Sequence, residues 1–174
     1  MSEPADNNDF GIALTYSARA PLTWNATELP VTAAIDSKNE QSLRTILNLS
    51  EHHNNDVGEE FAALERKVDI TLEMVASLLR ASIDMPSEKE FQLGAHEIRW
   101  QQTSALPSPG EKLNVIIYLH ELYPMPLTLA GQVRAVTQQE CVVQLATQTP
   151  DVQQLLEKFI FLHHRRSIAH AKQL

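Results

Sequence analysis

The sequence predicts a mainly β fold with added α-helices, in which short antiparallel strands form a barrel or a sandwich. Apolar side chains alternate with a period of two near the start of the chain and again over residues 91–146, as in strands with one buried face. Between these regions, and again near the C-terminal end, apolar residues recur every three or four positions, as in amphipathic helices. The 174 residues are the length of one typical domain.

The N-terminal part predicts a tail followed by a first strand. Residues 1–9 are polar and acidic, and we expect them to form a disordered tail. Ile12, Leu14 and Tyr16 then alternate with smaller residues, which places the first strand within residues 10–30. Neither the basic flank nor the apolar stretch of a signal peptide is found in this part, so we expect a cytoplasmic protein.

Two helices are predicted for the insertion at residues 35–84. Ser37 and Glu40 have the spacing of a capping box, which predicts that the first helix runs from about residue 37 to 53. A polar segment rich in Asn and His follows and predicts a break. The second helix is expected from residue 59 to about residue 81.

The second predicted helix carries apolar residues in a heptad pattern. A stripe of this length packs either on the core of its own domain or on a helix of another chain, and the pattern alone is compatible with both. A polar Thr in the seam lowers the stability of a coiled coil but fixes its register. The seam consists of Phe61, Leu64, Val68, Thr71, Val75 and Leu78, widened by Leu72 and Leu79.

The C-terminal half is rich in predicted strands. We expect four of them, of which the first is interrupted at His96 and Glu97. Thr149, Pro150 and Asp151 then form the start of a closing helix, and the apolar face of this helix should pack on the sheet. The four strands are expected at residues 91–100, 113–119, 127–136 and 141–146.

The charge of the chain excludes some classes of partner. The formal net charge is −8, and residues 31–90 carry twelve acidic and six basic side chains. An acidic surface disfavours binding to DNA, RNA or anionic lipid. The longest apolar run, residues 115–119, is far shorter than the ~20 residues that a membrane-spanning helix needs. We therefore expect no nucleic-acid partner and no membrane span.

The sequence has no fingerprint motif of a cofactor-dependent enzyme. Cys141 is the only cysteine, so no intrachain disulfide can form, and its apolar neighbours favour a buried thiol over a nucleophile. Adjacent histidines point about 100° apart on a helix, so both cannot easily bind one ion. We therefore expect no catalytic residue and no metal site, although a zinc site remains an alternative for His52, His53, His163, His164 and His170.

A basic cluster lies near the C-terminal end and includes Lys158, Arg165 and Arg166. Cations at this position complement the negative end of the closing helix. The alternative is a docking patch for an acidic partner, a nucleotide phosphate or the acidic helices of another subunit.

Residues 91–100, with the sequence FQLGAHEIRW, resemble the PilZ-domain strand whose usual motif is Asp/Asn-x-Ser-x-x-Gly. The segments 113–119, 126–133 and 155–161 follow at intervals that match this family. The resemblance implies a six-stranded antiparallel β-barrel with a helical insertion after the first strand and a C-terminal helix. It also implies one domain, residues 10–174, in which residues 10–30 and 88–174 form the barrel and closing helix. As a family, PilZ domains are bacterial receptors for cyclic di-GMP.

The ligand motifs of the family are degenerate in this chain. The first motif, Arg-x-x-x-Arg, is absent, since no two arginines are four positions apart and Arg19 is the only one before residue 44. In the second motif Gln92 takes the place of the acid or amide, Gly94 replaces the serine and Glu97 replaces the glycine. These changes remove hydrogen bonds and place a negative charge where a dianion would bind. We expect no cofactor, and weak or no binding of cyclic di-GMP.

The helical insertion also resembles a feature of some atypical PilZ proteins, in which the longer of two inserted helices forms a coiled-coil tetramer. The resemblance implies a homo-oligomer, with a tetramer favoured. The hypothesis is a non-enzymatic bacterial signalling adaptor that acts through self-assembly and a protein partner of unknown identity. The alternative is a genuine cyclic di-GMP receptor with a noncanonical basic site at Arg19, Arg99 or Arg165 and Arg166. A metal-dependent enzyme is a remote alternative.

Overall fold

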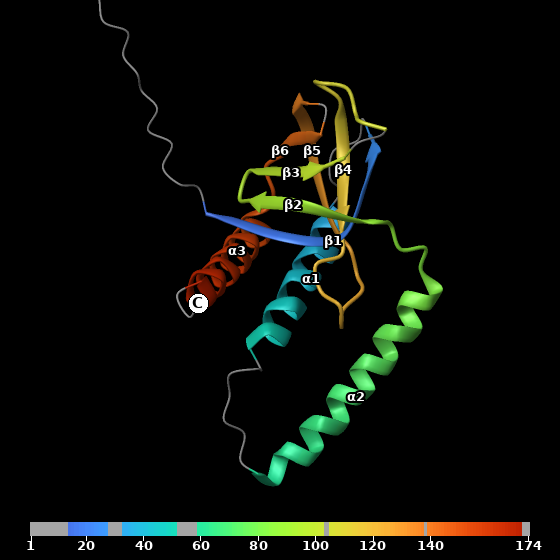
Figure 1. The fold of residues 1–174 in the computed structure, drawn as a ribbon, viewed down its shortest axis with the longest axis vertical. Coiled ribbons are helices and arrows are strands. Elements are labelled where there is room, and N and C mark those ends of the chain that lie inside the picture. Colours follow the sequence, from blue (N-terminus) through green and yellow to red (C-terminus); the bar gives the residue numbers. More distant parts are fainter. Residues whose placement is uncertain (1–13, 28–32, 52–58, 103–104, 138, 172–174) are drawn as a thin grey trace, which may run out of the picture.

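Six antiparallel strands close into a barrel in the computed structural model, and three helices lie outside it in the part of the chain that the structure describes (Figure 1). The structure describes residues 14–27, 33–51, 59–102, 105–137 and 139–171. The elements in chain order are β1 (Thr15–Ala26), α1 (Ala33–Glu51), α2 (Glu59–Ser82), β2 (Glu88–Gly94), β3 (Glu97–Gln101), β4 (Lys112–Ile117), β5 (Leu127–Val136), β6 (Glu140–Leu145) and α3 (Pro150–Ala171).

The barrel closes through β1. The strand order around the barrel is β1-β2-β3-β6-β5-β4. The first part of β1, from Thr15 to Pro21, pairs with β2, and its second part, from Leu22 to Ala26, pairs with β4. Pro21 stands where β1 changes partner, a position at which a missing backbone N–H is tolerated. The predicted barrel, insertion and closing helix are therefore confirmed.

One predicted strand is in fact a hairpin. Residues 91–100 were expected to form a single interrupted strand, but β2 ends at Gly94 and β3 begins at Glu97. Leu93 pairs with Ile98, and both side chains are buried. The odd spacing between these two residues would place them on opposite faces of one continuous strand, so only a turn brings both into the core.

The core fills the barrel and extends to α1 and α3. Trp100 and Phe159 are the largest fully buried side chains. α3 packs on β1 and β2, and α1 packs beside α3 and on β5. The predicted apolar face of α3 is confirmed, because Leu155 is half-buried and the core includes Val152, Leu156, Phe159 and Ile160.

α1 begins earlier than the sequence predicted. It starts at Ala33, so Ser37 lies inside the helix and the expected capping box is wrong. The physical reason is the high helix propensity of Ala33 and Ala34, which extends the helix toward the N-terminus. The predicted end of this helix at residue 53 and the predicted tail, residues 1–9, lie outside the described residues.

A buried asparagine attaches α1 to the barrel. Asn39 is almost completely buried, and its side-chain nitrogen donates to the carbonyl oxygen of Thr128 at 2.7 Å. The backbone N–H of Thr128 donates to Asn39 Oδ1 at 2.9 Å. The amide therefore satisfies both backbone groups of one β5 residue, as an adjacent strand would do.

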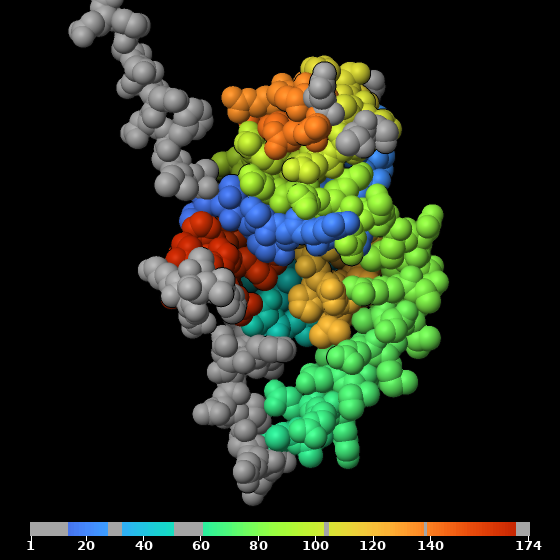
Figure 2. Space-filling view, viewed as in Figure 1, coloured from blue at the N-terminus to red at the C-terminus, as the bar shows by residue number. Residues whose placement is uncertain are grey.

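α2 stands apart from the rest of the fold. Its observed bounds agree closely with the predicted helix at residues 59–81. It packs against no other named helix or strand of the described chain, and Figures 1 and 2 show it along one side of the molecule, separate from α1 and α3. Among the described residues, no helix has the length and apolar character needed to cross a membrane.

We predict that Gly131→Ala destabilises the barrel by about 1–3 kcal/mol. A Cβ added at Gly131 would lie 2.5 Å from Val143 Cγ1 and 2.6 Å from the carbonyl oxygen of Gln144, so β5 and β6 would have to separate. Urea denaturation measures the loss. Gly94→Ala is the matched control, because the nearest atom to its added Cβ is 3.5 Å away. Equal stability of the two variants would contradict the prediction.

Candidate functional site

The degenerate motif surrounds the turn between β2 and β3. Gln92 is exposed on β2, Gly94 is the buried last residue of that strand, and Glu97 is the first residue of β3. Gln92 pairs in register with Arg99. The structure therefore places four of the five predicted ligand-site residues on this hairpin, and the remaining one, Arg19, pairs in register with Glu90 of β2.

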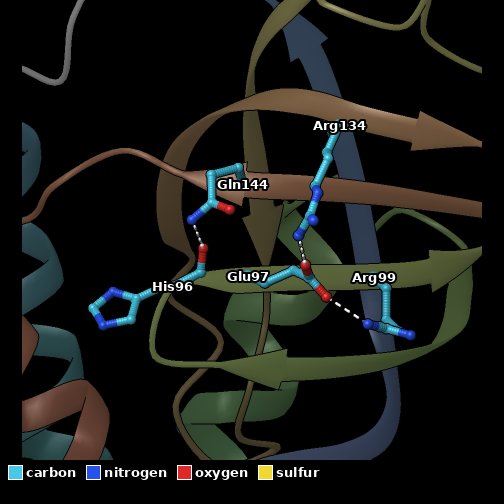
Figure 3. A network of polar contacts seen from close by, with 5 residues as sticks. All are labelled: His96, Glu97, Arg99, Arg134 and Gln144. Atoms are coloured by element: carbon cyan, nitrogen blue, oxygen red, sulfur yellow. Dashed lines mark hydrogen bonds and ion pairs between the residues drawn. The ribbon is translucent and has the colours of Figure 1, made fainter. Parts of the chain in front are cut away.

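The carboxylate of Glu97 bridges two arginines (Figure 3). Arg99 Nη2 lies 2.5 Å from Glu97 Oε1, and Arg134 Nη1 lies 3.4 Å from Glu97 Oε2. The side chain of Glu97 is 27% exposed, whereas that of Arg134 is 67% exposed. Glu97, which we aligned with the motif glycine from the sequence alone, is therefore held between two positive charges at the barrel surface.

The turn itself is held by neighbouring elements. The carbonyl oxygen of His96 accepts hydrogen bonds from Gln144 Nε2 at 2.8 Å and from the backbone N–H of Leu145 at 2.9 Å. Gln153 Nε2, on α3, donates to the carbonyl oxygen of Ala95 at 3.4 Å. Because β6 and α3 both bind the turn, the position of Glu97 beside it is fixed.

A surface hollow of about 350 Å³ lies beside the same hairpin, and strand residues alone line it. Arg19 and Arg99, two residues of the alternative noncanonical site, contribute to its wall together with Gln92. Glu90 and Glu140 line it as well, and Arg19 forms an ion pair with Glu88 at 3.2 Å.

Acidic side chains balance the arginines of this surface. Four carboxylates accompany three guanidinium groups, which gives 3 − 4 = −1 for the set. A site for a dianionic nucleotide ordinarily carries a surplus of positive charge. The set consists of Arg19, Arg99, Arg134, Glu88, Glu90, Glu97 and Glu140.

The basic residues of α3 lie elsewhere. Arg166 Nη2 donates to the carbonyl oxygen of Ser50 at 2.7 Å and so connects α3 to α1. The guanidinium of Arg165 lies 5.7 Å from the centre of the Phe161 ring, and Lys158 is exposed. Within the predicted patch, Arg166 therefore connects two helices, whereas Lys158 and Arg165 are exposed at the surface of α3.

A half-buried histidine joins α3 to β1. His163 packs against the rings of Tyr16 and Phe159 at centroid distances of 4.8 and 4.3 Å, and its Nε2 is buried without a hydrogen-bond partner. Burial, together with the nearby charges of Arg166 and His120, lowers the pKa of His163. The ring of His163 therefore lies at the edge of the core.

The other histidines do not form a metal site in the described part of the chain. No three side chains of His, Cys, Asp or Glu gather there in a way that could hold a metal ion. His52, His53 and the side chain of His170 lie outside the described residues.

Cys141 is buried in β6. Burial and the neighbouring carboxylate of Glu140 raise the pKa of its thiol to about 11. The thiol is therefore protonated at neutral pH, which disfavours a nucleophilic role.

Most of the predicted seam on α2 is exposed to solvent, whereas Leu72 is half-buried. Phe61 is 60% exposed and Leu78 is 71% exposed. Thr71 Oγ1 donates to the carbonyl oxygen of Lys67 at 2.8 Å, so its hydroxyl is satisfied within the helix. Ile70 and Met74, which the heptad pattern omitted, are also exposed. At about 100° per residue Met74 flanks the seam, whereas Ile70 lies on the side of the helix away from it.

Arg134 is the residue of this surface that the sequence did not indicate. It lies at a β-bulge, because the pairing of β5 with β6 shifts register between Val133 and Ala135. A bulge changes the direction in which a side chain points, and the alternation of apolar and polar residues in the sequence does not reveal it. Its partner Glu97 is 37 residues away in the chain, so no local spacing connects the two.

Comparisons with known proteins agree on one family. A family model described as an atypical PilZ domain, cyclic di-GMP receptor, matches residues 43–173. Among solved structures, the chain is similar to a pathogenic protein from Xanthomonas campestris, described as a new tetrameric PilZ domain self-assembled via an unusual helical bundle. The two share 23% identity and a TM-score of 0.72, and the match covers 92% of this chain and 93% of the other. A search of curated proteins gives no match.

We predict that acid weakens the attachment of α3 through His163. Because the pKa of His163 is lowered in the folded state, the unfolded chain takes up this proton at higher pH, and the free energy of unfolding should fall as the pH drops below about 6.5. Near pH 8 the ring is neutral in both states and this contribution is constant. Urea denaturation at several pH values should show a weaker pH dependence for His163→Phe than for the wild type, and identical profiles would contradict the prediction.

Proposed function

Because this chain belongs to the atypical PilZ family, as its motifs predicted, we propose that it is a non-enzymatic signalling adaptor of the bacterial cytoplasm. It acts through self-assembly and a protein partner rather than through tight binding of cyclic di-GMP. The observation that carries the proposal is the exposed apolar face of α2. Of the twelve large hydrophobic residues that are exposed in the described chain, eight lie on this helix.

An apolar face of this size is unstable in water on its own. Full burial of a Val, Leu, Ile, Phe or Met side chain contributes about 1.5–3 kcal/mol relative to exposure. Soluble monomers rarely expose a large contiguous patch of this kind, and such patches mark interaction surfaces. Because α2 packs on no named element of its own chain, the expected partner of this face is another copy of α2.

The width of the face favours a tetramer over a dimer. Val68 and Val75 occupy equivalent positions of the seam, and Leu79 and Met74 lie on its two opposite flanks. A two-stranded coiled coil buries a narrow stripe, whereas each helix of a four-helix bundle contacts two neighbours. The Xanthomonas protein, described as tetrameric through a helical bundle, supports this choice.

The barrel surface supports the weak-ligand part of the proposal. Arg19 and Arg99, which line the hollow, each have an acidic partner within ion-pair distance. A dianion would have to displace these carboxylates, and Glu97 would repel it from the edge of the hairpin. A second candidate function, a cyclic di-GMP receptor with a noncanonical site, is favoured by the single observation that both arginines and Gln92 share one hollow.

We predict that the wild-type protein is an oligomer and that Val68→Glu/Val75→Glu dissociates it. The double variant places two carboxylates in a seam that the bundle would bury, where an unpaired charge is very unfavourable. Static light scattering at high micromolar concentration should give about four times the chain mass for the wild type and one chain mass for the variant.

The matched control is Arg66→Glu/Arg80→Glu, which places two new carboxylates on the polar face of the same helix. This control should keep the mass of the wild type. A monomeric wild-type protein at high micromolar concentration would contradict self-assembly through α2.

We predict that isothermal titration calorimetry of the wild type with cyclic di-GMP gives no sub-micromolar affinity. The physical reason is the excess of carboxylates around the arginines of the barrel surface. The titration is performed on protein of known oligomeric state. If the wild type instead binds cyclic di-GMP with sub-micromolar affinity, and Arg19→Ala and Arg99→Ala abolish this binding, the protein is a receptor with a noncanonical site.

A further inference from the structure

We propose that Arg99 and Arg134 form an anion site for a phosphate group, and that the carboxylate of Glu97 occupies this site within the folded chain. The proposal rests on the weak-ligand part of the proposed function and explains it by a specific contact. Glu97 then acts as an internal ligand that keeps the two guanidinium groups from external phosphates.

The two arginines come from strands that are not neighbours. Arg99 lies on β3 and Arg134 on β5, with β6 between them in the barrel. Figure 3 shows both guanidinium groups directed at the one carboxylate from opposite sides. Each contacts a different oxygen atom, Arg99 at Oε1 and Arg134 at Oε2. Two donors that meet separate oxygen atoms of one anion are also the arrangement that binds a phosphate.

The β-bulge makes this convergence possible. At Val133 and Ala135 the register of β5 shifts against β6, and Arg134 is the extra residue between them. The β6 residue that pairs with both Arg99 and Ala135 is Val142, which has a short side chain. Arg134 therefore reaches across β6 to the side chain of Glu97 on β3. Without the bulge, the regular register of β5 would point Arg134 in another direction.

The site is held in place before any ligand arrives. The carbonyl oxygen of His96, next to Glu97 in the chain, is bound by Gln144 and by the backbone N–H of Leu145. A fixed backbone places the carboxylate beside the arginines at a high effective concentration. An external phosphate at low concentration therefore competes poorly, although an exposed ion pair is by itself weak.

The test removes the internal anion and measures binding of external ones. Full-length wild type and Glu97→Gln are titrated by calorimetry at low ionic strength, with inorganic pyrophosphate in one series and cyclic di-GMP in another. We expect Glu97→Gln to bind pyrophosphate about tenfold or more tightly than the wild type, because a negative charge in the site is replaced by a neutral amide. The cyclic di-GMP series shows whether the opened site also accepts a phosphodiester carried by a nucleotide.

Two controls test whether a gain in pyrophosphate affinity comes from a specific site or only from the change in net charge. Glu88→Gln also removes one carboxylate, but it frees only Arg19 from its ion pair, and it should bind pyrophosphate no better than twofold more tightly than the wild type. Glu97→Gln/Arg134→Ala should lose the gained affinity. Glu97→Ser removes the same carboxylate with a smaller side chain and gives an independent measurement if the amide variant folds poorly.

The proposal is overturned if Glu97→Gln and Glu97→Ser, both folded by circular dichroism, bind pyrophosphate no more tightly than the wild type. It is also overturned if Glu88→Gln gains as much as Glu97→Gln. Tight cyclic di-GMP binding by the wild type would instead contradict the proposed function, so the two failures are distinct results.

Discussion

The double pairing of β1 is the constraint on which the rest of the molecule depends. This strand binds β2 with its first part and β4 with its second, and it thereby satisfies the two edges that five strands would leave open. The next strand along the chain, β2, pairs beside the start of β1. The long insertion between β1 and β2 therefore leaves and re-enters the barrel without a break in the sheet.

The two inserted helices have different surroundings. α1 contributes to the stability of the domain, whereas the exposed face of α2 is the surface that we propose for assembly. α1 is part of the domain core, because Leu43 and Ile46 are buried and Asn39 satisfies the backbone of Thr128. α2 packs on no named helix or strand of the described chain, and most of its large apolar side chains are exposed.

That barrel surface combines arginines and carboxylates so closely that neither charge dominates. Arg19 has Glu88, and Arg99 and Arg134 share Glu97. Exposed pairs of this kind contribute about 0–1 kcal/mol each to stability. Their main effect is on recognition, because a ligand must replace an existing partner of each arginine before it gains a new one.

The sequence by itself determined the fold family, the helix at about residues 59–81, the strand at residues 127–136 and the apolar face of α3, because each depends on local periodicity or local motifs. The prediction was wrong at the start of α1, where the helix propensity of Ala33 and Ala34 extends the helix beyond the Ser37–Glu40 motif. It was also wrong at the β2–β3 turn, where the odd spacing of Leu93 and Ile98 requires a turn to bury both side chains. Only the tertiary structure decided which side chains meet at the barrel surface. Glu97 and Arg134 meet because of strand order and a bulge, and pairing between distant strands has no period within the sequence. Only the tertiary structure likewise showed that most of the α2 seam is exposed. The sequence pattern of an apolar stripe is the same whether the core of its own domain or another chain covers it.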